Sequence, residues 1–490
     1  MTAFAVWAPS ASSVELDAGG TRTVMVRDER GWWSCDAAGV TDYRYVVDGK
    51  GPFPDPRSPW QPSGIDGPSR VVDHGAFAWT DAGWRGVELS TAVLYELHVG
   101  TFTPEGTFDA VVGKLDHLVD LGVDAIELLP VAEFSGDRGW GYDGVDLYAP
   151  HHAYGGPDGL KRLVDACHGR GIGVVMDVVY NHLGPAGNHL SKFGPYFTSS
   201  HQTAWGDAVN FDGEGSDEVR AFVIDNALMW LRDYHCDGLR LDAVHAIVDD
   251  SPVHVLEELA ARVAELDRPR FLVAEDERED ARVVRARARG GHGIDAVWAD
   301  DWHHALHTVL TGENAGYYAE FGSLDQLATA LGEAWVRRRP PDDLHAGQFV
   351  ICTQNHDQVG NRAAGERLSQ LVGPDALRYA AALLLTSPFV PMLFMGEEWG
   401  ASTPFRYFTD HADPALARAV SEGRRSEFRD FGWDPADVPD PQDPATFEAS
   451  KLRWDEVERG DHAALLEWYR TLIARRRELS GRGRTRAPRA

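Results

Sequence analysis

The sequence has few cysteines and no uninterrupted apolar run of membrane-spanning length, and each shortage excludes a class of protein. The four cysteines among 490 residues are far apart and form no Cys-x-x-Cys pair, so a disulfide framework or cysteine metal centre is not expected. The apolar stretch from Tyr379 to Met395 is interrupted by Pro388 and Pro391, which argues against a membrane span. The opening residues MTAFAVWAPS lack the pattern of a secretory signal. We therefore expect a cytoplasmic protein that does not bind a membrane.

Positive charge is also scarce. The chain has 47 basic and 76 acidic residues, for a formal net charge of -29. Such a field repels nucleic acid and anionic lipid and suits a neutral substrate. The apolar content of 43% is ordinary for a protein with a large core. The length allows about three domains, or one large barrel with a satellite domain.

Residues 1–85 are predicted to form a β-sandwich domain. Short strand-like segments alternate with turns rich in Gly, Asp and Ser; they read AVWAP, SVELD, TVMVRD, GWWSCDA and YRYVVDG. This spacing is typical of a sandwich of antiparallel sheets. The following segment GPFPDPRSPWQPSG is rich in proline and lacks periodicity, which indicates a crossover between domains.

Residues 90–479 are predicted to form an α/β catalytic domain, a (β/α)8 TIM barrel. Eight apolar runs of strand length alternate with helical patterns; they cover 92–100, 123–131, 173–180, 238–244, 271–276, 294–300, 348–354 and 390–396. Strict alternation of buried strands and helices favours a closed parallel barrel. Its loops are expected to be enlarged at 181–216 and 397–460. The basic tail 480–490 is expected to be disordered.

Polar residues stand at the ends of several predicted strands, where barrels carry their catalytic groups. They are Asp177, Asn181 and His182 after the third strand, Arg240 and Asp242 in the fourth, Glu275 after the fifth, and His356 and Asp357 after the seventh. Each has a plain structural explanation, such as a helix cap, a salt bridge or a core histidine, and Trp140 and Tyr142 could be loop packing. Three carboxylates converging on one rim, however, suit chemistry better than stability.

Cleavage of a glycosidic bond needs this set of groups. One carboxylic acid protonates the leaving oxygen, and a second carboxylate attacks the sugar or activates water. Arg240 would keep Asp242 ionised, and neighbouring carboxylates would keep Glu275 protonated. Histidine and asparagine would bind sugar hydroxyls, which would explain the polar stretch TQNHDQVGNR from Thr353 to Arg362.

The motifs DVVYNH, GLRLDAVH, VAED and NHD, in this order, resemble the four signature regions of the α-amylase superfamily of glycoside hydrolases. The resemblance implies that Asp242 is the nucleophile, Glu275 the general acid/base and Asp357 the transition-state stabiliser of a retaining enzyme. It also implies a set of substrate-binding residues at the subsite of the attacked sugar. That set is His182, Arg240, His356 and a stacking Tyr142, with Trp140 and Asp177 beside them.

Longer stretches, among them LYELHVGTFTPEGTFDA and WADDWHHALHTVLTGENAGYY, are similar to the maltooligosyltrehalose trehalohydrolases within that superfamily. This similarity implies a trehalose-capped α-1,4-glucan as substrate and trehalose as product. Two departures stand out. Glu279 occupies a position that is usually Asn, which leaves an outer contact open, and the family's C-terminal β domain is not recognisable after residue 479.

Alternatives remain on sequence grounds. A glycogen-branching or other α-1,4-glucan-active enzyme would share the triad and barrel, and a non-catalytic glucan-binding barrel would have lost the carboxylates. His303 and His307 have the i, i+4 spacing of metal ligands, but polar packing is expected, with no metal and no cofactor. The segments 300–304 and 397–399 could line the leaving-group side or only pack the rim. The protein is expected to be a monomer or a dimer.

Overall fold

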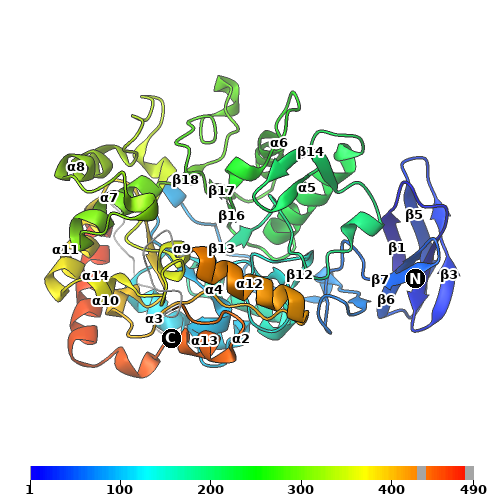
Figure 1. Cartoon of the computed structure of the whole chain (residues 1–490), viewed down its shortest axis with the longest axis horizontal. Coiled ribbons are helices and arrows are strands. Elements are labelled where there is room, and N and C mark those ends of the chain that lie inside the picture. Colours follow the sequence, from blue (N-terminus) through cyan, green and yellow to red (C-terminus); the bar gives the residue numbers. More distant parts are fainter. Residues whose placement is uncertain (1, 428–437, 480–490) are drawn as a thin grey trace.

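The computed structural model describes residues 2–427 and 438–479, and its centre is a closed barrel of parallel strands (Figure 1). The barrel strands are β9 (Leu94–Leu97), β10 (Ala125–Leu128), β13 (Gly173–Val178), β16 (Gly238–Leu241), β17 (Phe271–Ala274), β18 (Ala296–Trp298), β19 (Phe349–Cys352) and β20 (Val390–Phe394). Each pairs with the next, and β20 pairs with β9 to close the ring. Each strand lies within one of the eight predicted runs, so the predicted (β/α)8 barrel is confirmed.

Helices surround this ring. The α-helices are α1 (Val99–Phe102), α2 (Phe108–Val112), α3 (Leu115–Leu121), α4 (Gly156–Gly169), α5 (Ser216–Arg232), α6 (Val255–Val263), α7 (Asp300–Thr311), α8 (Leu324–Glu333), α9 (His356–Gly360), α10 (Leu368–Leu371), α11 (Pro374–Thr386), α12 (Pro414–Glu427), α13 (Pro444–Ala449) and α14 (Gly460–Leu479). The predicted helical segment 108–122 is divided into α2 and α3, because Gly113 interrupts it with a residue of low helix propensity. Helix α14 packs against α3 and α11 and completes the outer layer.

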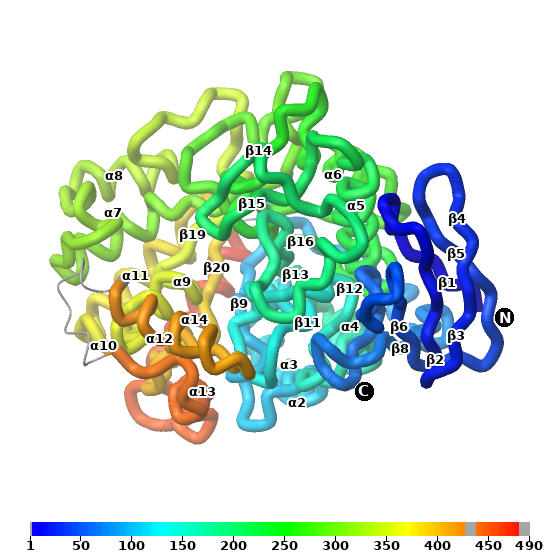
Figure 2. The backbone as a smooth tube through the Cα atoms, turned by 45° about the vertical axis from the view of Figure 1, so that its right-hand side comes forward, coloured from blue at the N-terminus to red at the C-terminus, as the bar shows by residue number. Residues whose placement is uncertain are grey.

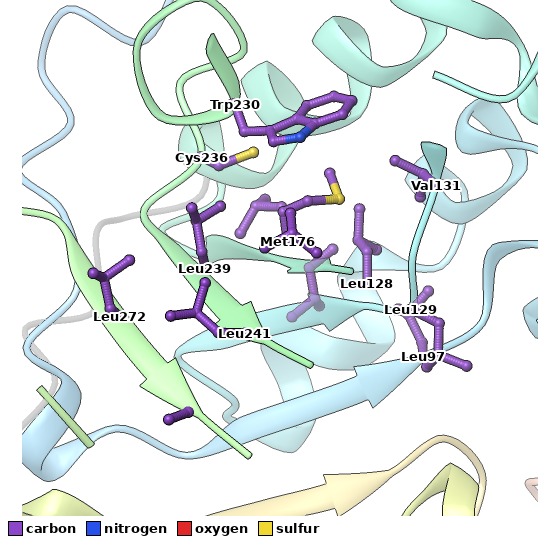
Figure 3. Packing of buried hydrophobic residues seen from close by; sticks show 14 of the residues in the cluster. Leu97, Leu128, Leu129, Val131, Met176, Trp230, Cys236, Leu239, Leu241 and Leu272 are labelled. Atoms are coloured by element: carbon purple, nitrogen blue, oxygen red, sulfur yellow. The ribbon is translucent and has the colours of Figure 1, made fainter. Parts of the chain in front are cut away.

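The core lies between the strands and the helices. All residues of the eight barrel strands are buried, as expected for parallel strands covered on both faces. Figure 3 shows one sector, in which Met176, Leu239 and Leu241 of neighbouring strands lie beneath Trp230 of α5. This packing holds the strand ends, and the polar residues that follow them, in fixed positions.

The N-terminal region is rich in strands and lies at one side of the barrel (Figures 1 and 2). Its strands are β1 (Thr2–Trp7), β2 (Val14–Ala18), β3 (Thr21–Val24), β4 (Val26–Arg27), β5 (Trp32–Ala37), β6 (Asp42–Val47), β7 (Lys50–Phe53) and β8 (Ser69–Arg70). They form a sheet in the order β1-β5-β4 and a second in the order β3-β2-β6-β7, with β8 beside β6. Phe4 and Tyr43 join the two sheets with ring centroids 4.8 Å apart.

The loops expected to be enlarged contain elements of their own. A hairpin of β14 (Phe197–Thr203) and β15 (Gly206–Val209) lies between β13 and α5, and the short pair β11 (Ala132–Glu133) and β12 (Asp146–Pro150) follows β10. The long loop after β20 contains α12 and α13. The predicted tail 480–490 lies outside the described residues.

No helix among the residues that the structure describes is both long enough and apolar enough to span a bilayer.

Candidate active site

Arg240 is the centre of the polar cluster at the carboxyl ends of the strands. Its guanidinium is fully buried on β16 and contacts three carboxylates from three consecutive strands. Nη1 lies 2.9 Å from both oxygens of Asp177 and 2.8 Å from Asp242 Oδ1, and Nη2 lies 2.7 Å from Glu275 Oε2. The Trp298 ring lies 4.3 Å from the guanidinium carbon. One cation therefore faces three acids, a wider role than the predicted partnership with Asp242 alone.

The exposed fractions of the side chains show which way the site opens. They rise from 0% for Arg240 to 10% for Asp242, 20% for Glu275 and 36% for Asp357. The guanidinium thus lies beneath the carboxylates, and the carboxylates face the rim. The structure brings together the three carboxylates that were predicted to converge from strands β16, β17 and β19.

Asp242 is held from two sides. Arg240 binds Oδ1, and Asn181 Nδ2 donates to Oδ2 at 2.7 Å and to the Asp242 backbone carbonyl at 2.8 Å. Donors to both oxygens restrict the rotation of the carboxylate. Asp242 is thereby held in one orientation.

Glu275 combines burial with donors to only one of its oxygens. Burial raises its pKa, Arg240 opposes this effect, and the nearby Asp242 adds to it. Arg240 Nη2 and the Ala243 amide both donate to Oε2, at 2.7 and 2.8 Å. Oε1 is consequently the oxygen available to carry a proton. Burial, rather than neighbouring carboxylates as predicted, is the main cause of the raised pKa.

His356 connects the Arg240 cluster to Asp357. Its Nδ1 lies 2.6 Å from Glu96 Oε1, and its Nε2 lies 2.8 Å from the Tyr142 hydroxyl and 3.4 Å from Asp357 Oδ1. Burial lowers the pKa of His356, but Asp357 and Glu96 outweigh this effect and raise the pKa to about 10. The imidazole is therefore a cation that donates from both nitrogens.

The loop between β11 and β12 places two aromatic residues against this imidazole. Tyr142 stacks on His356 with centroids 5.1 Å apart and donates to Asp177 Oδ2 at 2.6 Å. Trp140 meets the edge of His356 and is only 6% exposed, so its ring supports the site from behind. Gly141 between them has φ +102°, and a Cβ there would lie 2.0 Å from the Pro130 carbonyl oxygen. Only glycine allows this close approach.

His182 lies on the other side of Asn181 and forms a short hydrogen bond with it through Nδ1. Burial lowers its pKa to about 4, so the ring is neutral. Trp205, at the turn between β14 and β15, stacks on His182 with centroids 4.4 Å apart and is 50% exposed. The hairpin thus adds an exposed aromatic ring to the predicted site.

The polar stretch from Thr353 to Arg362 is satisfied mostly by the chain itself. Asn355 caps α9 by accepting from the amides of Asp357 and Gln358, and Gln358 Oε1 accepts from the Asn355 amide at 3.0 Å. Gln354 accepts from the Leu368 amide at 2.9 Å. The side-chain oxygens of Gln354, Asn355 and Gln358 therefore need no sugar, whereas Asn355 Nδ2 is buried without a partner among the described residues. Asp357 is the acid of the stretch that faces the rim.

The residues considered for the leaving-group side are largely buried. Glu398 accepts from the Tyr95 hydroxyl and lies 2.8 Å from His117 Nε2, while Glu397 accepts from Thr353 and Tyr469. Trp399, Asp301, Trp302 and His303 are all at most 2% exposed, whereas Asp300 and His304 are partly exposed. The buried side chains pack the rim, and contact with substrate stays a prediction for Asp300 and His304.

The histidines of α7 take part in polar packing, as expected. His303 Nδ1 lies 2.8 Å from the Thr353 carbonyl and its Nε2 lies 2.9 Å from the Tyr318 hydroxyl. His307 Nε2 lies 2.7 Å from Glu313. These contacts account for three of the four ring nitrogens of His303 and His307 without a metal ion.

Glu279, the departure noted in the sequence, pairs with a second acid. Burial and then Asp301 raise its pKa to about 8. The amides of Val336 and Arg337 donate to both Glu279 Oε1 and Asp301 Oδ2, so the two buried carboxylates lie side by side. Glu279, whose outer contact the sequence left open, therefore makes an internal contact with Asp301.

The prediction missed one acid of the site, Glu96, and considered a second, Asp300, only for the leaving-group side. Glu96 is the third residue of β9 and contacts both the backbone amide and the ring Nδ1 of His356. Asp300 begins α7, and burial, then Glu275 and Asp357, raises its pKa to about 7. Glu96 was visible as a carboxylate at a strand end, whereas the position of Asp300 depends on where β18 stops.

Comparisons with known proteins agree with this geometry. Residues 69–203 match the family described as alpha amylase, catalytic domain. The chain is 55% identical to a malto-oligosyltrehalose trehalohydrolase of Arthrobacter ramosus, over 97% of this chain and 87% of that protein. A crystal structure from Salmonella typhimurium, described as an alpha amylase, superposes with a TM-score of 0.89 at 43% identity, covering 97% of this chain and 84% of the other. A 1,4-alpha-glucan branching enzyme of Pseudoalteromonas atlantica is 27% identical, over 95% of this chain and 69% of that protein.

Proposed function

The chain belongs to the malto-oligosyltrehalose trehalohydrolases of the α-amylase superfamily, and we propose that its strand-end cluster carries out a retaining hydrolysis. It is a glycoside hydrolase that cleaves the α-1,4 bond next to the terminal trehalose of a maltooligosyl trehalose and releases trehalose. The observation that carries this activity is the identity of 55% over nearly the whole chain. The branching-enzyme alternative is less well supported, because identity to that relative is 27%.

Asp242 is assigned as the nucleophile. Its carboxylate accepts hydrogen bonds from Arg240 on one oxygen and from Asn181 on the other, which hold it in position for attack. It attacks the anomeric carbon as the bond to the trehalose oxygen breaks, which forms a glycosyl ester. Water then hydrolyses this ester with net retention of configuration. Retention requires the Asp242 and Glu275 carboxyl groups to lie about 5–5.5 Å apart in the reacting complex.

Glu275 is assigned as the acid and then the base. Burial raises its pKa, so the carboxyl can hold a proton on Oε1 while Arg240 and the Ala243 amide hold Oε2. That proton passes to the departing trehalose oxygen, and Glu275 takes a proton back from the attacking water. Each cycle thus returns both carboxyl groups to their starting state.

Asp357 is assigned as the stabiliser of the positively charged transition state, because it is the most exposed carboxylate of the cluster. The sugar being attacked is assigned to the surface formed by Tyr142, His182 and His356, with Arg240 and Asp177 beneath it. A cation at His356 and a neutral ring at His182 supply different hydrogen-bond patterns to the sugar hydroxyls. Trp140 is assigned a supporting role behind His356.

The location of the enzyme is proposed to be the cytoplasm. All four cysteines are free thiols, which suits a reducing compartment. The proposed partner is the neutral glucan substrate alone, consistent with the net charge of -29.

A competition experiment tests the specificity. Equal concentrations of maltopentaose and maltotriosyl trehalose contain the same number of glucose units, and their products are separated by chromatography. We expect trehalose to be the main disaccharide, since a site that pairs polar groups with trehalose discriminates against maltose. Similar consumption of both sugars would instead identify a general amylase-type hydrolase. New branch points in amylose would identify the branching enzyme.

A further inference from the structure

A second cluster of metal-ligating side chains lies outside the catalytic cluster, at the base of the loop that carries Trp140 and Tyr142. It consists of Glu133 at the end of β11 and of His151 and His152 directly after β12. One ligand atom from each of the three residues lies within 4.8 Å of the others. The proposed hydrolysis makes no use of these residues.

His151 is the observation that the rest of the chain does not explain. The side chain is fully buried, yet neither ring nitrogen has a hydrogen-bond partner among the described residues. Its ring stacks on Phe134 with centroids 3.8 Å apart, which fixes its orientation, and Nδ1 lies 3.3 Å from Glu133 Oε1. A buried imidazole without partners is costly, so a missing ligand at this position would remove the cost.

The surroundings carry the negative charge that a cation needs. Glu133 is fully buried, and Asp146 lies opposite it in the β11–β12 pair with Oδ2 buried and unpaired among the described residues. Burial, with Glu133 and other acids, raises the pKa of Asp146 well above its ordinary value. An added divalent cation would relieve the repulsion between these two acids.

His152 has the arrangement of a metal ligand with its supporting partner. Nδ1 lies 2.6 Å from Glu133 Oε1, and Nε2 lies 3.1 Å from Asp137 Oδ1. A ligating histidine typically donates its other ring N–H to a carboxylate, which is the position of Asp137. Without a metal, the carboxylates on both sides favour the charged ring, and the hydrogen bond to Glu133 raises the pKa of His152.

The spacing requires only a small adjustment to accept an ion. Zinc bonds of about 2.0–2.1 Å in a tetrahedral site place neighbouring ligand atoms roughly 3.3 Å apart. The Glu133–His151 distance of 3.3 Å already has this value, and the Glu133–His152 distance of 2.6 Å would lengthen as a metal replaced the shared proton. Two imidazoles and one carboxylate favour zinc or a similar transition metal over calcium or magnesium.

We propose that Glu133, His151 and His152 bind one divalent transition metal ion of the zinc class. The ion bridges the end of β11 and the residues after β12, and so closes the base of the loop 134–145. That loop holds Tyr142 against His356, which connects the ion to the order of the catalytic rim.

The test uses the full chain without an affinity tag, freed of metal with a chelator and titrated with zinc chloride by calorimetry at pH 7.5. We expect one ion per chain and a higher melting temperature with zinc than with calcium. Absence of binding at about 100 µM zinc, or equal effects of the two metals, would overturn the proposal.

Variants locate the ion. Glu133→Gln and His151→Gln should each weaken zinc binding at least about 10-fold, since each removes one ligand. Asp212→Asn is the matched control, because Asp212 belongs to a second group with His201 and Asp250 that also brings three ligand atoms within 4.8 Å. Loss of binding in the control with retention in the first two variants would overturn the assignment.

Cobalt substitution gives a test that needs no variant. Cobalt(II) bound to the wild-type chain through nitrogen and oxygen should show visible d–d bands without the strong near-ultraviolet band of thiolate ligation. A thiolate band would place the ion on one of the free cysteines instead and overturn the proposal. This measurement distinguishes nitrogen–oxygen ligation from thiolate ligation even if a variant fails to fold.

Discussion

The two ends of the barrel each hold a buried cluster of acids and cations, and the clusters differ in charge balance. At the amino-terminal ends of the strands, His168 Nδ1 lies 2.9 Å from Asp81 and Nε2 lies 3.0 Å from Asp237. Arg268 donates to Asp81 at 3.1 Å, and the Trp84 indole donates to Asp237 at 2.7 Å and stacks on His168. Two acids thus face His168, His235 and Arg268, and both ring nitrogens of His168 are paired.

At the carboxyl-terminal ends, one guanidinium faces three acids. Arg240 contacts Asp177, Asp242 and Glu275, and burial raises the pKa of Asp177 to about 7 despite this cation. Burial acts on the opposite cluster too, but hydrogen bonds from His235, His168 and Arg268 outweigh it and lower the pKa of Asp81 to about 2.

The difference separates a structural cluster from a reactive one. The cluster around His168, here called the balanced cluster, stabilises the folded chain by pairing its buried acids, and the pKa of Asp81 in it lies far below neutral pH. A cluster with surplus acid keeps a proton near neutral pH, and that proton is available for catalysis. The predictions below follow from this contrast, in order of expected effect.

The largest effect should come from the reactive cluster. Asp242→Asn and Glu275→Gln each remove one proposed catalytic group with almost no change of shape, so kcat should fall about 10³-fold or more. The melting temperature should stay near that of the wild type, because an acid is removed where acids are in surplus. Turnover within 10-fold of the wild type in either variant would show that the assigned role is wrong.

A stability effect of similar importance should come from the balanced cluster. His168→Ala removes the ring that bridges the buried carboxylates of Asp81 and Asp237, which should lower the free energy of unfolding by about 3–5 kcal/mol. Urea unfolding followed by circular dichroism measures this loss, and kcat per folded molecule should be unchanged at low temperature. His189→Ala is the control, since His189 pairs with the exposed Asp66 and should cost less than about 1 kcal/mol. Equal losses of unfolding free energy in His168→Ala and His189→Ala would contradict a structural role for the balanced cluster.

The pH dependence of stability should differ between the two clusters. Burial, then Glu275 and Asp357, raises the pKa of Asp300 from 3.8 to about 7, so its stabilising contribution is present at low pH and is lost as the pH rises through about 7. Asp300→Asn should therefore raise the melting temperature relative to the wild type at pH 8 by a few degrees more than at pH 5. The lowered pKa of Asp81 acts in the opposite direction, since its contribution is lost only as the pH falls through about 2. A constant difference between pH 5 and pH 8 would refute the assignment for Asp300.

The smallest effect should come from the acid pair beside the site. Glu279→Gln removes the need for a proton between Glu279 and Asp301. The free energy of unfolding should therefore increase at pH values above the Glu279 pKa of about 8, by no more than about 1 kcal/mol. Urea midpoints at pH 7 and pH 9 measure the change. Glu277→Gln, in the same loop but exposed, is the control and should show none. A gain at pH 7 as large as that at pH 9 would argue for a cause other than the shared proton.

Much of the fold could be predicted because its units are local. Each barrel strand is an apolar run followed by a helical pattern, and this alternation survives without knowledge of long-range contacts. The catalytic candidates could be predicted for the same reason, since Arg240, Asp242 and Glu275 stand at strand ends. Division of the segment 108–122 into two helices was not predicted, although Gly113, where α2 ends, was a local signal for it.

Other features depend on residues far apart in the chain. Glu96 binds His356 across 260 positions, and Asn181 reaches Asp242 across 61. The sequence also did not show whether a polar residue contacts a ligand or another part of the chain. Gln354 and Glu398, for example, have partners within the chain. The pair β11–β12 brings Glu133 to His151 and His152 through a bulged register that no local pattern indicates.

The sequence by itself determined which residues the barrel presents at its rim, because strand periodicity and strand order place Asp242, Glu275 and Asp357 at one end. Only the tertiary structure decided what each of them can do. A pKa depends on burial and on neighbours in three dimensions, so Arg240 beneath three acids and Glu96 behind His356 had to be seen in place.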